Sequence, residues 1–117
     1  VNDVAQITNK DSIISCANKM TDKPLGAALL LENDFLKGIV TEGDLRKSIS
    51  TNSSLSNSIE PFINDNPISI HSSVSTLDAM KIMEDRSSQI SCLPVVDSDG
   101  KCLGLLTLHD LYQTKLV

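Results

Sequence analysis

The sequence is poor in aromatic residues and in positive charge. Its 117 residues include no tryptophan, one tyrosine and two phenylalanines, and ten Lys and Arg stand against fifteen Asp and Glu, for a formal net charge of -5. Nucleic-acid binding usually needs a basic face, and single-strand binding also needs aromatic stacking platforms. Because both are missing, the composition argues against a nucleic-acid partner. It still permits a local pocket for one small phosphate ligand.

Long apolar runs are missing as well. No run approaches the roughly 18 residues that a membrane span requires, and no basic and apolar signal segment opens the chain. The three cysteines, Cys16, Cys92 and Cys102, form no Cys-x-x-Cys pair, which argues against a disulfide framework and against a metal site. Each stands among apolar residues and is expected to act as a small buried hydrophobe. These features predict a cytoplasmic protein without a membrane partner.

One pattern occurs twice in the chain. A glycine, two aliphatic residues, a threonine, an aspartate and a leucine recur in register in residues 38–45 and 104–111. The second glycine lies 66 residues after the first, which is too long for a solenoid period and suits two modules of about half the chain. The duplication therefore predicts two copies of one small fold.

The similarity between the two halves extends upstream of this pattern. Residues 11–20 align with residues 74–83; both segments carry a serine suited to an N-cap, followed by apolar residues at helical spacing. Two short apolar runs joined by an Asp/Asn/Gly turn follow each helix and indicate a hairpin. Each half is thus predicted as β-α-β-β-α, with strands at residues 4–7, 27–31, 35–40, 67–70, 93–96 and 102–107, and with second helices at 42–50 and 108–115.

The predicted fold class is α+β, with the two β-α-β-β-α repeats packed as a pseudo-two-fold pair. A module of about 50 to 60 residues is marginal alone, so two copies that bury their sheets against each other would share one core. The segment between them is polar and rich in Ser and Asn, like a linker. After it, Ile59, Phe62 and Ile63 are apolar enough to pack back on the core. The predicted boundaries are 1–52 for the first module, 53–60 for the linker and 61–117 for the second module.

The repeated pattern has two interpretations. Thr41 stands where a strand ends and a helix begins, and Asp44 lies in the first helical turn, so the pair can simply cap the helix and complement its dipole. The same geometry can also bind a ribose phosphate, with helical N–H groups and a hydroxyl for the phosphate and a carboxylate for the sugar. Its recurrence at Thr107 and Asp110 favours such a ligand clamp for the pair as a whole. Gly38 and Gly104 would allow close backbone approach.

The pattern resembles the CBS domain, named after cystathionine β-synthase, and the resemblance covers residues 4–112. It implies the α/β-type CBS fold, a tandem pair, two clefts and adenine nucleotides as regulators, with no required cofactor. By this resemblance the threonines contact phosphate and the aspartates contact ribose. Residues before each first helix would line the base, among them Ile7, Ile68 and Ile70. His109, beside Asp110, is a further candidate for phosphate contact.

A narrower resemblance is to the paired CBS domains of bacterial arabinose-5-phosphate isomerases, carried by residues 23–26, 38–47 and 108–111. It implies a sugar-isomerase (SIS) domain attached to this pair in the parent protein, a role in Kdo, lipopolysaccharide or capsule synthesis, and a homo-dimer or higher homo-oligomer. AMP, ADP, ATP and CMP-Kdo are the candidate regulatory ligands. Thr107 departs from this group, since many of its members have histidine there.

Three functions remain open from the sequence. The first is a non-catalytic, ligand-sensing regulatory module that biases a neighbouring domain. The second is a structural module that holds an isomerase oligomer together and binds no ligand. The third, an enzyme in its own right, is the weakest, because the clamp residues come without a nucleophile and its base.

Overall fold

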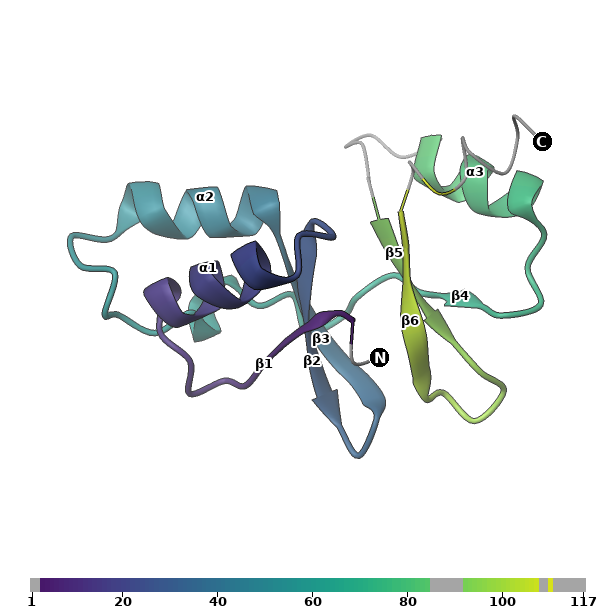
Figure 1. Ribbon diagram of the computed structural model, residues 1–117, viewed down its shortest axis with the longest axis horizontal. Helices are drawn as coiled ribbons and strands as arrows, with labels where there is room; N and C mark the ends of the chain where they lie inside the picture. Colours follow the sequence, from purple (N-terminus) through teal and green to yellow (C-terminus); the bar gives the residue numbers. More distant parts are fainter. Residues whose placement is uncertain (1–2, 85–91, 108–109, 111–117) are drawn as a thin grey trace.

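The computed structural model describes residues 3–84, 92–107 and 110, and Figure 1 shows two sheets side by side. The first sheet has the order β1-β2-β3 and the second the order β4-β5-β6. Within each sheet the first two strands are parallel and the last two antiparallel. Parallel neighbours need a crossover, and a helix supplies it in both halves, which confirms the predicted repeat as far as the structure describes it.

The first half contains all five predicted elements. They are β1 (Ala5–Ile7), α1 (Ile13–Asp22), β2 (Ala27–Glu32), β3 (Phe35–Thr41) and α2 (Glu42–Thr51).

The second half contains β4 (Ile70–His71), α3 (Thr76–Glu84), β5 (Cys92–Val96) and β6 (Cys102–Thr107). β4 is shorter than the predicted strand, and the helix predicted for residues 108–115 lies outside the described residues except at Asp110. A 3-10 turn, η1 (Glu60–Phe62), precedes β4. Within the described ranges, no helix has the length and apolar character that a membrane crossing requires.

Serine side chains start the first helix of each half, as predicted. Ser12 Oγ accepts a hydrogen bond from the Ser15 N–H at 3.1 Å, and Ser75 Oγ accepts one from the Asp78 N–H at 3.1 Å. Each bond satisfies one of the amide groups that have no partner within the helix. The β2–β3 turn is equally local: Asn33 and Asp34 have φ values of 52° and 70°, a left-handed conformation that Asn and Asp adopt more readily than most residues.

The first sheet is apolar on both faces. Alternate residues point to opposite sides of a strand, so Ala28 and Val40 pack against α1 in one core cluster, whereas Ala27, Leu29 and Ile39 form a second cluster with the other half of the chain. The second sheet contributes Cys92 and Cys102 to that shared cluster. Because the sheets bury apolar faces against each other, neither half has a complete core alone. A third cluster lies between α3 and its own sheet.

The two hairpins also meet at their turns. The backbone N–H of Cys102 donates to the Asp34 carbonyl oxygen at 2.7 Å, and Phe35 and Lys101 form an antiparallel bridge. The Lys101 ammonium lies 6.0 Å from the centroid of the Phe35 ring. These contacts join the modules at one end of the pair.

The chain between the modules belongs structurally to the first core. Ile59 is fully buried there, and Phe62 and Ile63 pack against the same cluster. The chain then passes beside β3 at Asn64. The Asn64 N–H donates to the Ile39 carbonyl at 2.9 Å, and the Ile39 N–H donates to the Asn64 carbonyl at 3.0 Å. A Cβ at Gly38 would lie 2.7 Å from Ile63 Cγ2, so only glycine permits this close approach.

The two repeated glycines should therefore respond differently to substitution. Gly38→Ala should destabilise the protein by about 1–3 kcal/mol, because the added methyl overpacks the site. Gly104→Ala, where no described atom lies within 4 Å of the added Cβ, should be neutral or slightly stabilising. Urea unfolding of both variants measures the difference, and equal destabilisation would contradict this assignment.

Candidate functional site

Thr41 and Asp44 form a reciprocal cap at the start of α2. The Asp44 N–H donates to Thr41 Oγ1 at 3.3 Å, while the N–H and the hydroxyl of Thr41 donate to Asp44 Oδ2 at 3.0 and 2.9 Å. This is a capping box with aspartate in the acidic position. The capping interpretation is thus confirmed, and the hydrogen bonds that the Asp44 carboxylate makes with the described residues all use Oδ2.

The second copy repeats this arrangement. The Thr107 N–H donates to Asp110 Oδ2 at 3.2 Å, and the Asp110 N–H donates to Thr107 Oγ1 at 3.1 Å. The predicted site residue His109 lies outside the described residues. Both copies therefore hold a hydroxyl and a carboxylate together at the end of a strand.

The remaining predicted site residues lie in three kinds of environment. Gly38 is buried under Ile63, so the close approach observed there is by the chain itself. Ile7 and Ile70 are only 2% and 6% exposed and belong to the first and third clusters, with Ile68 packed against the third. Gly104 has no described atom within 4 Å of an added Cβ. Ligand contacts at these positions remain predictions.

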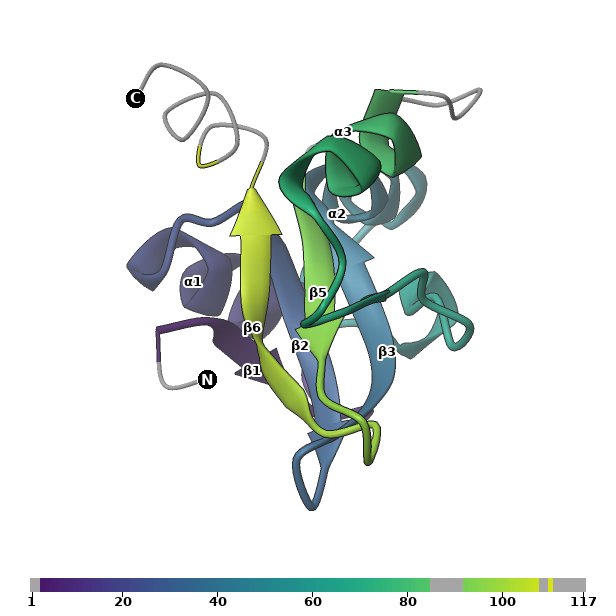
Figure 2. The ribbon, with the colours of Figure 1, turned by 90° about the vertical axis from the view of Figure 1, so that its right-hand side faces the viewer.

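Both copies of the motif lie at the same end of the pair. The hairpin turns meet at one end, and β3 and β6 run from these turns toward Thr41 and Thr107 at the other (Figure 2). In the first sheet β1 and β2 also start near this end, since Ala5 pairs with Ala28, and Ala27 pairs with Thr41. The two threonines thus lie at the same end of the pair as the start of β1.

A cavity of about 400 Å³ opens beside these strand ends in the first module. β1 and the residue before it form one wall, and the C-terminal half of α1 with the following lysine forms the other. A volume of this size is within the range of small-molecule sites. The cavity has two cationic residues and one acidic residue, and its lining consists of Val4, Ala5, Gln6, Lys19, Asp22 and Lys23.

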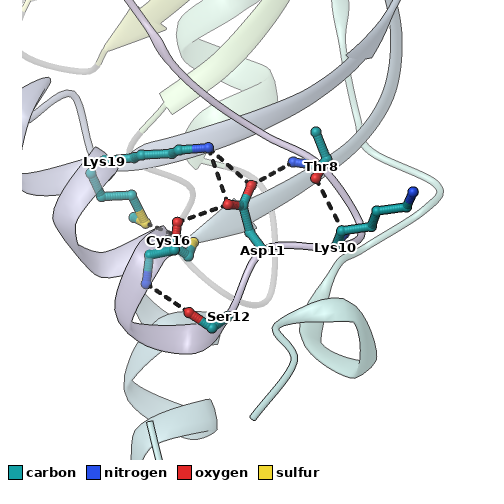
Figure 3. Close-up of polar contacts among 8 residues, drawn as sticks. Thr8, Lys10, Asp11, Ser12, Cys16 and Lys19 are labelled. Carbon is teal, nitrogen blue, oxygen red and sulfur yellow. Dashed lines mark hydrogen bonds and ion pairs between the residues drawn. The ribbon is translucent and has the colours of Figure 1, made fainter. Parts of the chain in front are cut away.

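Lys19 connects this cavity to a network around Asp11 (Figure 3). Its ammonium donates to both carboxylate oxygens of Asp11, at 3.1 and 3.0 Å. The Thr8 N–H and the Ser15 hydroxyl donate to the same carboxylate at 2.8 and 2.7 Å. The Asp11 side chain is 13% exposed and that of Lys19 41%, so the lysine is the accessible member of the ion pair.

The network stabilises the charged form of Asp11. Partial burial alone would raise the pKa of the carboxyl, but hydrogen bonds from Thr8, Ser15 and Lys19, together with the charge of Lys19, lower the pKa below its ordinary value. Folding therefore favours the ionised carboxylate.

The cysteines follow the prediction of small buried hydrophobes, since all three are buried and none forms a disulfide. Burial, and to a lesser extent the charge of Asp11, raises the pKa of Cys16 to about 11, which keeps this thiol protonated and unreactive. Among the described residues, no group of three His, Cys, Asp or Glu side chains could hold a metal ion.

Sequence reasoning missed the roles of Lys19, Asp22 and Lys23. Their spacing is that of an ordinary exposed helix face, and an ion pair between positions 11 and 19 does not follow from helical periodicity. A signal was present in the repeat itself. The positions of Asp11 and Lys19 are Val74 and Ile82 in the second copy, so a charged pair stands where the other module has an apolar pair.

Comparisons with known proteins agree with the duplicated architecture. The family model described as CBS domain matches residues 1–51 and again 59–115. Arabinose 5-phosphate isomerase KdsD from Francisella tularensis is 34% identical over 116 residues, which cover 98% of this chain and 35% of the isomerase. The chain thus spans about a third of the length of this curated relative.

Solved structures share the whole arrangement. A protein with CBS domains from Burkholderia ambifaria has a TM-score of 0.83 at 28% identity, covering 97% of this chain and 82% of that one. CBSX2 from Arabidopsis thaliana, solved in complex with AMP, has a TM-score of 0.78 at 22% identity, covering 98% and 89% of the two chains. At that identity, the second likeness is one of fold.

The Asp11 network predicts a loss of stability in acid. Because the pKa is lowered in the folded state, the unfolded state binds more protons, and the stabilisation is present above the ordinary value of 3.8 and lost as pH falls through the folded-state pKa. The difference in unfolding free energy between wild type and Asp11→Asn should shrink as pH falls below 3.8. Denaturant unfolding across this range, with Asp65→Asn as an exposed control, measures it; a pH-independent difference would contradict the assignment.

Proposed function

This chain belongs to the CBS domain family, and from that premise we propose that it is a non-catalytic regulatory module for a nucleotide. The ligand would be AMP, ADP, ATP or a sugar nucleotide such as CMP-Kdo. The observation that carries the proposal is the doubled Thr-x-x-Asp cap. Both copies stand at the same end of the paired sheets, and the first lies on the sheet that borders the cavity.

The cap geometry suits a sugar phosphate. In the first turn of α2 the Glu42 N–H donates to the Gly26 carbonyl and the Asp44 N–H to Thr41 Oγ1. The Gly43 N–H and the positive end of the helix dipole are therefore what this turn offers to a phosphate. Asp44 Oδ1 has no described partner and can accept from a sugar hydroxyl while Oδ2 keeps the helix capped. One aspartate can therefore serve the helix and the ligand together.

The parent protein is proposed to be a bacterial, cytoplasmic sugar-phosphate isomerase. The arabinose 5-phosphate isomerase relative is about three times as long as the part that matches this chain, which leaves room for an attached SIS domain. Nucleotide binding would then bias that domain through a difference in affinity for two arrangements of the pair. The AMP complex of CBSX2 supports AMP as the first ligand to test.

Isothermal titration with AMP, ADP, ATP and CMP-Kdo tests the proposal. We expect at least one to bind, and Asp44→Asn or Asp110→Asn to weaken its binding by about tenfold, which corresponds to roughly 1.4 kcal/mol. Asp99→Asn removes the same charge from an exposed turn and should bind like wild type. Absence of binding by all four nucleotides, or wild-type affinity in both motif variants, would reject the proposal.

A second candidate function is a structural oligomerisation module. Ile14, in the first turn of α1, and Ile49, in the last turn of α2, are both 43% exposed, and these helix ends lie at the same end of the molecule (Figure 1). Exposed apolar side chains at one end of a molecule can be covered when two copies of the chain associate. This surface could therefore join two copies of the chain in a symmetric dimer.

Sedimentation at several concentrations tests that candidate. The wild type should form a dimer, and Ile49→Lys should shift it toward monomer because a charge is then buried at the contact. Ser50→Lys adds the same charge at the next position and serves as the control. A wild type that stays monomeric at high concentration would exclude this role.

A further inference from the structure

The two modules differ at a position where the repeat is otherwise well kept. Residues 11–20 align with residues 74–83, and the serine caps and buried methionines correspond. Within this frame, Asp11 and Lys19 of the first module are replaced by Val74 and Ile82, which pack against the third cluster. An ion pair costs desolvation that an apolar pair does not. The second module therefore shows that an apolar pair is compatible with this part of the fold.

Lys19 is the one residue shared by the ion pair and the cavity. It lines the cavity with Lys23, and its half-exposed side chain holds Asp11. A lysine ammonium is a mobile point charge with three donors. An anion in the cavity therefore competes with the Asp11 carboxylate for the Lys19 ammonium. The second module has isoleucine there, so it cannot respond in this way.

Asp11 is also attached to the segment that joins the modules. Its carbonyl accepts a hydrogen bond from the Ile59 N–H at 3.0 Å, and the Asn57 carbonyl accepts one from the Ile13 N–H at 2.9 Å. Ser12 and Ser58 form a β-bridge beside them. Ile59 itself is fully buried in the first core. The Asp11 turn is thereby hydrogen-bonded to residues 57–59 of the segment that joins the two modules, so a change in the turn can be transmitted to that segment.

We propose that Lys19, at the cavity of the first module, contacts the phosphate of the regulatory nucleotide in addition to the first turn of α2, and that this contact draws Lys19 away from Asp11. The inference rests on the proposed function and adds to it an unequal role for the two modules. The phosphate and the Asp11 carboxylate compete for Lys19. The Asp11 turn therefore has one state when the cavity is empty and another when the phosphate is bound. The segment at residues 57–59 is then the route by which the first module reports its ligand.

Titration of AMP and adenosine into wild type, Lys19→Gln and Asp11→Asn tests the competition. Lys19→Gln should weaken AMP binding by about tenfold and leave adenosine unchanged, because only AMP carries the anion. Asp11→Asn should tighten AMP binding by about threefold or more, since it removes the competitor for Lys19. Lys47→Gln, an exposed lysine on α2 outside the cavity lining, is the matched control and should bind like wild type.

A measurement on the unmodified protein avoids dependence on the folding of Asp11→Asn. The amide protons of Thr8 and Ile59 both donate to Asp11, so AMP should shift their NMR signals and adenosine should not. AMP affinity in Lys19→Gln equal to that in Lys47→Gln, weaker binding by a folded Asp11→Asn, or unshifted Thr8 and Ile59 amides would each overturn the inference. If wild type binds AMP in that case, the proposed function stands and only the role of Lys19 falls.

Discussion

The burial of one sheet against the other is the constraint on which the rest of this structure depends. Helices cover one face of the first sheet, and Ala27, Leu29 and Ile39 lie on the opposite face, which no helix of their own module covers. The second sheet supplies the missing cover through Cys92 and Cys102. A module of half this chain would expose that face, which explains why the fold occurs as a pair. The hydrophobic term thus determines the number of modules.

This packing also determines where polar chemistry can collect. With the hairpin turns in contact at one end, the strands that carry the two threonines finish together at the other end. A helix cap stabilises its own helix wherever it stands. The packing of the two sheets places both copies of this hydroxyl and carboxylate at one end of the pair, where they are the candidate ligand sites of the proposed function. Architecture converts a local stabilising device into a candidate site without a change of residue.

The repeat is symmetric in its folding residues and unequal in its charges. Serine caps, buried methionines and Thr-x-x-Asp boxes recur because each half must start the same helices and fill the same core. The Asp11–Lys19 pair does not recur, and it is partly exposed beside a cavity. Duplicated modules can diverge at positions where either a charged pair or an apolar pair is compatible with folding, and such positions are where two clefts can acquire different tasks.

Local interactions allowed the sequence to determine most of the elements. Ser12, Ser75 and Thr41 cap helices through groups only three residues away, and the Asn33–Asp34 turn depends on its own backbone preferences, so each was predictable from its neighbours. Tertiary structure alone decided the remainder. Gly38 is required by Ile63, 25 residues later in the chain, and Lys19 meets Asp11 only because α1 starts from a particular turn beside β1. Contacts between residues far apart in the sequence depend on how the helices and strands are oriented in space. That orientation is set by the apolar surface that both sheets bury together, which no single segment of the sequence specifies.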